Sequence, residues 1–119
     1  MKKIVLTAND DLGLEGNMAM HFGHCPYYVI AHVHDQGVEK TEVQENPYLN
    51  GHQPGQIPQF IKSLGADVII AGGMGVKAID WFEKLGIEVI TGAREKVGAT
   101  LNAYLAGQMA GASGCNHEH

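Results

Sequence analysis

Histidine and cysteine are concentrated in two short stretches of the sequence. HFGHC (21–25) begins with a histidine and ends with a cysteine, and CNHEH (115–119) contains one cysteine and two histidines. Thiolate and imidazole groups are common protein ligands of soft and borderline metal ions. The patterns therefore predict a metal site, against the alternative of a loop histidine beside a buried thiol and a solvated chain end. The candidate metal ligands are His24, Cys25, Cys115, His117 and His119.

The chain end can be joined to the first stretch by its own flexible segment. Cys115, His117 and His119 alternate with other residues, so in an extended segment they point to the same side. The preceding Gly, Ala and Ser residues predict a flexible chain, and about nine such residues have a root-mean-square reach of roughly 16 Å. A closed site needs about four ligands, and neither stretch contains two cysteines. We therefore expect HFGHC and CNHEH to form two halves of one site, within one chain or across a homodimer interface.

A glycine-rich turn provides a second candidate site. AGGMGVKA (71–78) follows a predicted strand and opens a predicted helix. The pattern G-x-G-x-x-A occurs in dinucleotide-binding proteins, but here only one strand follows it and the chain begins with a hairpin, which is wrong for that fold. Glycine N–H groups at a helix N-terminus form a cradle for an anion, and the alternative is a simple tight turn. The candidate cofactor-binding residues are Gly72, Gly73, Met74 and Gly75, with His21 and His52 from two loops.

Hydrophobic patterning places these residues in the loops of one α/β domain. The element order β-β-β-α-β-α-β-α predicts a mixed five-stranded sheet with an antiparallel hairpin and with helices on its faces. We expect a single domain over 1–107 and a flexible Cys/His tail over 108–119. Strands are predicted at 3–8, 27–34, 38–43, 67–72 and 87–91, and helices at 57–64, 76–85 and about 95–106.

Composition restricts the classes of partner. The 119-residue chain has a formal net charge of −5, which argues against nucleic acid and anionic membrane as partners. No stretch approaches the roughly 18 apolar residues of a membrane helix, and the apolar run at the start is too short for a signal peptide. We expect a cytoplasmic protein, in which two cysteines are free thiols or ligands before they form a disulfide.

Two further groups of polar residues have an ordinary structural interpretation. Asp10 and Asp11 end a strand, where carboxylates favour turns, although such residues also hold metal ions in nucleases. His32 and His34 fall on one face of a predicted strand and could bind a metal as a pair, but we expect a pair that faces solvent.

The segments HFGHCPYYVI, NP…GHQPG and DVIIAGGMGVKAIDWFEKLGIEVITG together resemble the dinitrogenase iron–molybdenum cofactor biosynthesis family. The resemblance covers roughly residues 1–107. It implies a ribonuclease-H-like three-layer α/β fold, and the binding, carriage or assembly of a metal–sulfur cluster rather than catalysis. The cofactor would be an iron and/or molybdenum cluster, and the partners would be cluster-assembly or acceptor proteins. The family's HFG motif maps onto His21, Phe22 and Gly23, whereas the next position, often arginine in the family, is His24 here.

Two other functions stay open at the level of sequence. The same cysteines and histidines could form a simple zinc or copper site without sulfide. A metal-dependent phosphoesterase that uses Asp10 is the less favoured alternative, because it rests on analogy of fold.

Overall fold

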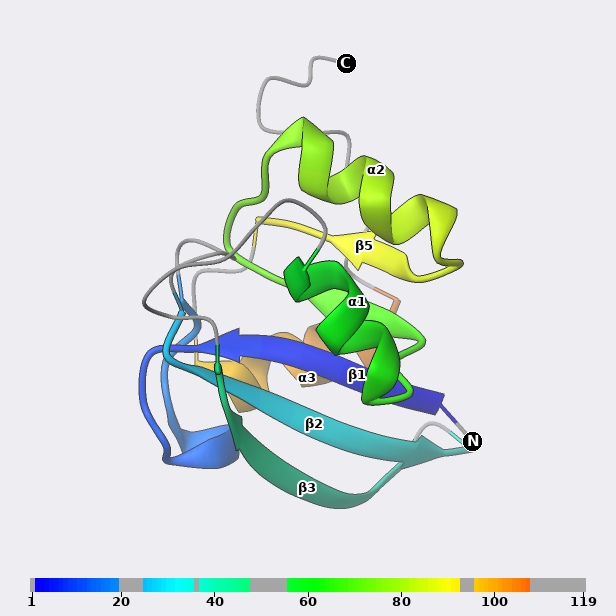
Figure 1. Cartoon of the computed structure of the whole chain (residues 1–119). Helices are drawn as coiled ribbons and strands as arrows, with labels where there is room; N and C mark the ends of the chain where they lie inside the picture. The colour runs from blue at the N-terminus through cyan, green and yellow to red at the C-terminus, as the bar shows by residue number, and fades with distance from the viewer. Residues whose placement is uncertain (1, 20–24, 36, 48–55, 93–95, 108–119) are drawn as a thin grey trace.

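A computed structural model describes residues 2–19, 25–35, 37–47, 56–92 and 96–107. The chain forms a five-stranded sheet with helices on both faces (Figure 1). The elements are β1 (Lys2–Ala8), the 3-10 helix η1 (Gly13–Glu15), β2 (Tyr27–His34), β3 (Gly37–Glu45), α1 (Gln56–Ser63), β4 (Val68–Ile70), α2 (Val76–Lys84), β5 (Glu88–Ile90) and α3 (Val97–Leu105).

The strand order in the sheet is β3-β2-β1-β4-β5. β2 pairs antiparallel with both β1 and β3, whereas β4 pairs parallel with β1 and β5. The carboxyl ends of β1, β4 and β5 therefore meet at one end of the sheet, together with the start of β2 and the end of β3. We call this the carboxyl end, and the end at which β1 starts the amino end. The mixed sheet and the order of elements agree with a ribonuclease-H-like topology.

Alternation along the strands divides the interior into two cores. α1 and α2 cover one face, where Phe82 and Ile61 pack against Val5 and Ile69. α3 covers the opposite face, where Leu101 packs with the neighbouring residues Ile4 and Leu6 of β1. Because successive strand residues point to opposite faces, an almost continuous apolar strand supplies both cores.

The predicted elements are confirmed, with shifts at their ends. The strand expected at 38–43 extends over Gly37–Glu45, because it pairs along the whole of β2. The strand expected at 67–72 is shorter, Val68–Ile70, and Gly72 already contacts Ala19 by a backbone hydrogen bond. The expected tail, 108–119, lies outside the described residues. Among the described residues, no helix is both long and apolar enough to cross a membrane.

β3 is the outermost strand beside β2, and nearly all of its side chains are exposed. Its charged residues are Glu39, Lys40, Glu42 and Glu45. Glu42 reaches back to β2, where its Oε2 atom lies 2.7 Å from Nε2 of His32. His32 is only 8% exposed, so the expectation of two solvent-facing histidines is wrong for His32, whose ring is covered at the β2–β3 pair. His34, at the end of β2, does face solvent.

Candidate cofactor-binding site

The glycine-rich turn connects β4 to α2 at the carboxyl end of the sheet. Gly75 is the N-cap of α2, with φ −71° and ψ 161°, and as a glycine it supplies no side chain to cap the first turn. A side chain added at Gly75 would meet no atom within 4 Å. The first-turn N–H groups of a helix have no partner within the helix, so this N-terminus offers donors to an approaching anion. Met74 contributes only main chain to this surface, because its side chain is buried in the core.

Main-chain hydrogen bonds attach the segment before HFGHC to this turn. The Gly72 N–H donates to the Ala19 carbonyl oxygen at 3.2 Å, and the Ala19 N–H donates to that of Thr7 at 3.0 Å. The Gly72 carbonyl oxygen accepts from the Gly92 N–H at 3.1 Å. Three loops are thus fixed side by side, and Ala19, the last described residue before HFGHC, lies next to the glycine turn.

Cys25, where the chain leaves HFGHC, is a core residue. Its side chain is 1% exposed and belongs to the core beneath α1 and α2. Burial raises the pKa of the Cys25 thiol to about 11, although hydrogen bonds from Tyr28 and from backbone groups of Cys25 and Ala8 oppose the rise. Burial also raises the pKa of Tyr28. Near neutral pH Cys25 is therefore a protonated thiol, whereas a metal ligand is a thiolate. In this conformation Cys25 matches the alternative of a small buried thiol.

Asn46 holds the segment that starts β2, and the sequence argument missed it. Its Nδ2 atom donates to the Cys25 carbonyl oxygen at 2.9 Å, and its backbone N–H donates to that of Pro26 at 2.9 Å. Asn46 is 6% exposed, so its amide replaces water in satisfying a buried carbonyl group. The Asn-Pro dipeptide was visible in the sequence as a turn, but nothing there identified the partner.

The candidate residues are thus only partly placed. Gly72, Gly73, Met74 and Gly75 form the turn described above, and Cys25 lies at the same end of the sheet. The remaining candidates lie outside the described residues, so their joint site with Cys25 stays a prediction. These are His21, His24, His52, Cys115, His117 and His119.

The carboxylates after β1 have a structural role. Asp10 accepts hydrogen bonds from the N–H groups of Leu12 at 3.3 Å and Asn17 at 3.4 Å. Gly16 leaves the space that the Asp10 side chain occupies, since a Cβ atom there would collide with it. Within the described residues, no three His, Cys, Asp or Glu side chains are grouped as metal ligands would be. Asp10 therefore behaves as the turn residue that its position favours.

The chain is similar to several known proteins over most of its length. It is 26% identical to the orange protein from Desulfovibrio gigas, solved in its apo form, with a TM-score of 0.86 over 98% of each chain. It is 33% identical in sequence to PH0822, whose crystal structure matches with a TM-score of 0.82 over 92% of this chain and 96% of that one. An uncharacterized protein of Methanocaldococcus jannaschii is 28% identical over 94 residues, which are 77% of this chain and 80% of the relative.

The family comparison covers the whole described fold. The dinitrogenase iron-molybdenum cofactor family matches residues 1–107, from the first residue to the end of the helical turn after α3. The match includes the glycine turn, the loops bound to it and Cys25. The chain therefore belongs to the dinitrogenase iron-molybdenum cofactor family.

Proposed function

We propose that this protein binds and carries a metal–sulfur cluster of the iron or iron/molybdenum type at the carboxyl end of its sheet. The observation that carries the proposal is the N-terminus of α2, where Gly75 supplies no capping side chain and an added Cβ atom would meet open space. Metal clusters surrounded by sulfide are anionic, and an anion is stabilised by the unpaired N–H groups and the dipole of a helix N-terminus. The adjoining Gly73 has no side chain that would obstruct a bulky group at this turn.

The donors at this end suit a cargo that brings its own sulfur ligands. Cys25 is buried and its thiol pKa is raised, which disfavours the thiolate form in the metal-free protein. The backbone N–H groups of the α2 N-terminus can donate to the outer sulfur atoms, as hydrogen bonds do around protein-bound clusters. A cluster held in this way can be released without breaking a metal–protein bond, which favours a carrier over a catalyst. Donor and acceptor proteins of the cluster-assembly type would be its partners.

The relative from Desulfovibrio gigas supports the same class of function. It is called the orange protein, and its structure is of an apo form. A visible colour requires a chromophore other than the amino-acid side chains, and an apo form implies a second form with a group bound. A coloured group on a chain that shares this fold over 98% of its length is consistent with a cluster as cargo.

The first experiment measures the cargo itself. The full chain is purified without oxygen, or reconstituted with iron, molybdate and sulfide, and its metals, acid-labile sulfide and visible spectrum are determined. We expect stoichiometric sulfide and a broad charge-transfer band in the visible range. A colourless protein that holds zinc without sulfide would instead support the simple metal-binding alternative.

A substitution at Gly75 then tests the position of the cargo. An Asp at this N-cap would accept hydrogen bonds from first-turn N–H groups and place a negative charge there. We expect Gly75→Asp to leave the melting temperature unchanged or slightly raised, while cluster affinity falls at least tenfold. The control is Ala99→Asp, which adds the same charge at an exposed position in the first turn of α3. Equal cluster binding by both variants would remove α2 from the site.

A further inference from the structure

The outer edge of the sheet is formed by β3, which among the described strands pairs with β2 alone (Figure 1). Just after β3, the backbone N–H of Asn46 donates to the Pro26 carbonyl oxygen, so at this position the main chain faces β2. The main-chain groups of an antiparallel pair alternate in direction from one residue to the next. The N–H and C=O groups of Val43 and Thr41 therefore point away from β2, toward the outside of the sheet.

Apolar side chains accompany these outward main-chain groups. Val38, Thr41 and Val43 lie opposite β2 residues of the core beneath α3, so their side chains are on that face of the sheet. Val38 is 38% exposed and Val43 is 41% exposed. Leu12, just before η1, is 63% exposed, and η1 adjoins Val43, since a Cβ atom added at Gly13 would lie 3.9 Å from its side chain. Exposed β-branched residues on an edge strand favour pairing with a further strand.

Negative charge dominates the remaining exposed side chains of β3. Three of its four charged residues are glutamates. Nζ of Lys40 lies 3.6 Å from Oε2 of Glu42, the same oxygen that contacts His32. Glu39 and Glu45 form no ion pair with any other described residue. Like charges on adjacent strands repel, so this edge favours an added strand that carries cations.

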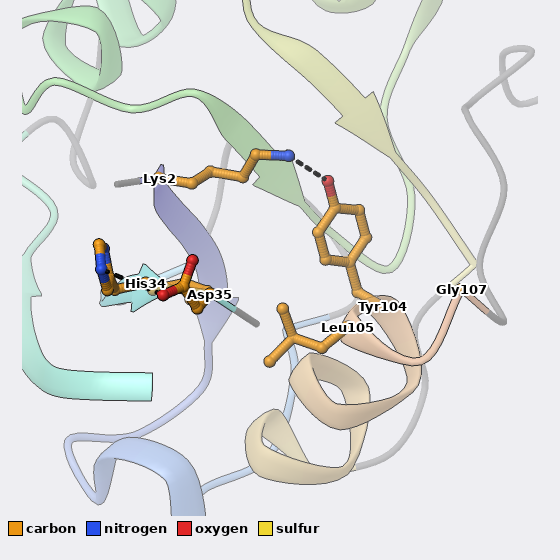
Figure 2. Close-up of a pocket in the computed structure, with 7 residues that line it drawn as sticks. Lys2, His34, Asp35, Tyr104, Leu105 and Gly107 are labelled. Atoms are coloured by element: carbon orange, nitrogen blue, oxygen red, sulfur yellow. Dashed lines mark hydrogen bonds and ion pairs between the residues drawn. The ribbon is translucent and has the colours of Figure 1, made fainter. Parts of the chain in front are cut away.

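Lys2, at the amino end of the sheet, is directed away from β3. It lines an open hollow of about 510 Å³ together with His34 and Asp35 of the β2–β3 turn (Figure 2). Its Nζ atom donates to the Tyr104 hydroxyl at 3.4 Å, and Figure 2 shows the side chain extending toward Tyr104 rather than toward the turn. Asp35 adds an exposed carboxylate just before β3. The excess negative charge along β3 is therefore available to cations of a partner.

We propose that the outer edge of β3 is a docking site for an extended segment of another protein, in which β-branched residues alternate with Lys or Arg. The segment adds a strand to the sheet, and its main chain forms hydrogen bonds with the outward groups of Thr41 and Val43. Because side chains alternate between the faces of a sheet, its apolar residues extend the surface of Val38 and Val43, and its cations lie near the glutamates. This surface is separate from the cargo site and the inference does not depend on it.

The test uses the full-length, metal-free, ¹⁵N-labelled chain and two end-blocked peptides of about nine residues, the length of β3. Valine alternates with lysine in one peptide and with glutamate in the other. We expect the lysine peptide to shift the amide signals of β3 and to slow hydrogen exchange of the Thr41 and Val43 N–H groups at least tenfold. Its affinity should fall as salt is added. The glutamate peptide should bind at least tenfold more weakly.

Val43→Pro tests the main-chain hydrogen bonds. Proline removes an N–H group that points away from β2, which an edge strand tolerates, so circular dichroism should show a folded chain. We expect the affinity for the lysine peptide to fall at least tenfold. Val43→Ala is the matched control, because it removes the apolar side chain and keeps the N–H group. If Val43→Ala lowers the affinity as much as Val43→Pro, the peptide does not bind as a strand and the proposal is wrong.

A charge reversal tests the choice of partner. The double variant Glu39→Lys and Glu45→Lys should prefer the glutamate peptide to the lysine peptide. Asp80→Lys with Glu83→Lys makes the same change of net charge at exposed positions of α2 and should keep the preference for the lysine peptide. If this control reverses the preference as well, net charge rather than the edge of β3 controls binding, which overturns the proposal.

The free protein provides the last check of the occupant. We expect the N–H groups of Thr41 and Val43 to exchange rapidly in the chain without peptide, and sedimentation to show a monomer. Slow exchange in a monomer would mean that another part of the chain already covers this edge. A dimer that Val43→Pro dissociates would make a second copy the occupant. Either result overturns the proposal, as would peptide-induced shifts that are confined to elements other than β3.

Discussion

The two ends of the β-sheet differ in the chemical groups that form them. At the carboxyl end, small residues and main-chain hydrogen bonds join Thr7, Ala19, Gly72 and Gly92, and the nearby thiol of Cys25 is buried. At the amino end, long polar side chains from β1, β2 and α3 surround an open hollow. A surface of backbone N–H groups suits an anion that is already assembled, whereas exposed imidazole and carboxylate suit a bare cation. The two ends of one small sheet therefore differ in the groups that they expose, main chain at one end and polar side chains at the other.

The reactivity of Cys25 should show the largest difference. A rise in pKa from 9.0 to about 11 lowers the thiolate fraction near neutral pH about 100-fold, because each pKa unit is a factor of ten. In a Cys115→Ser background, alkylation of Cys25 at pH 8, followed by mass spectrometry, should be at least 100-fold slower in the folded chain than in denaturant. Fast alkylation of the folded chain would mean that Cys25 opens to solvent and can serve as a ligand at the carboxyl end.

The same pKa predicts how stability responds to alkaline pH. The folded state binds the thiol proton more tightly than the unfolded state, so this contribution is fully present below about pH 9 and is lost as pH rises through about 11. Chemical denaturation of the wild type and of Cys25→Ala should converge in this window. Parallel pH profiles would show that Cys25 ionises equally well in both states.

Tight packing at the carboxyl end should make Gly98 intolerant of a methyl group. A Cβ atom there would lie 2.9 Å from the Leu14 carbonyl oxygen, which belongs to the backbone of η1. Helix propensity alone predicts that Gly98→Ala stabilises α3 by about 1 kcal/mol, but the displacement of η1 should reverse the sign and give a net loss of about 1–2 kcal/mol. Urea denaturation measures the difference, and a gain in stability would show that η1 moves away at little cost.

The amino end should tolerate the loss of its polar contacts. Tyr104→Phe removes the hydroxyl that joins Lys2 to Glu88, and both hydrogen bonds are exposed. Water can replace such bonds, so we expect stability to fall by no more than about 0.5 kcal/mol. If Tyr104→Phe lowered stability as much as Gly98→Ala, the polar contacts at the amino end would matter as much for stability as the packing at the carboxyl end.

Removal of residues 108–119 should have the smallest effect on folding. The buried residues of α3, Val97, Thr100 and Leu101, all precede the truncation. The sequence 108–119 has no periodic apolar residues, so we expect its removal to cost little core area. The melting temperature of the metal-free truncated protein should stay within about 1 °C of that of the full-length chain, because a small change in stability shifts it only slightly. A drop of many degrees would indicate that the tail packs on the domain without metal.

The fold was predictable because apolar residues recur with a regular spacing along its strands and helices. The site was not predictable, because its loop residues follow no such pattern. The apolar run of β1 and the helical spacing of Val76, Ile79 and Phe82 each indicate one structure. Cys25, by contrast, looks the same in sequence whether it is a ligand or a core residue. Its side chain lies in the core beneath α1 and α2, where it contacts Tyr28, and its carbonyl oxygen is bound by Asn46, which follows β3.

The charged outer strand also affects how copies of the protein behave toward one another. β3 presents nine residues at the edge of the sheet, and four of them carry charge. A neighbouring chain that added a strand to this edge would have to desolvate those charges, and three of the four are carboxylates that would repel their counterparts in an identical strand. The charges on β3 therefore oppose the addition of a second copy of the chain at this edge of the sheet.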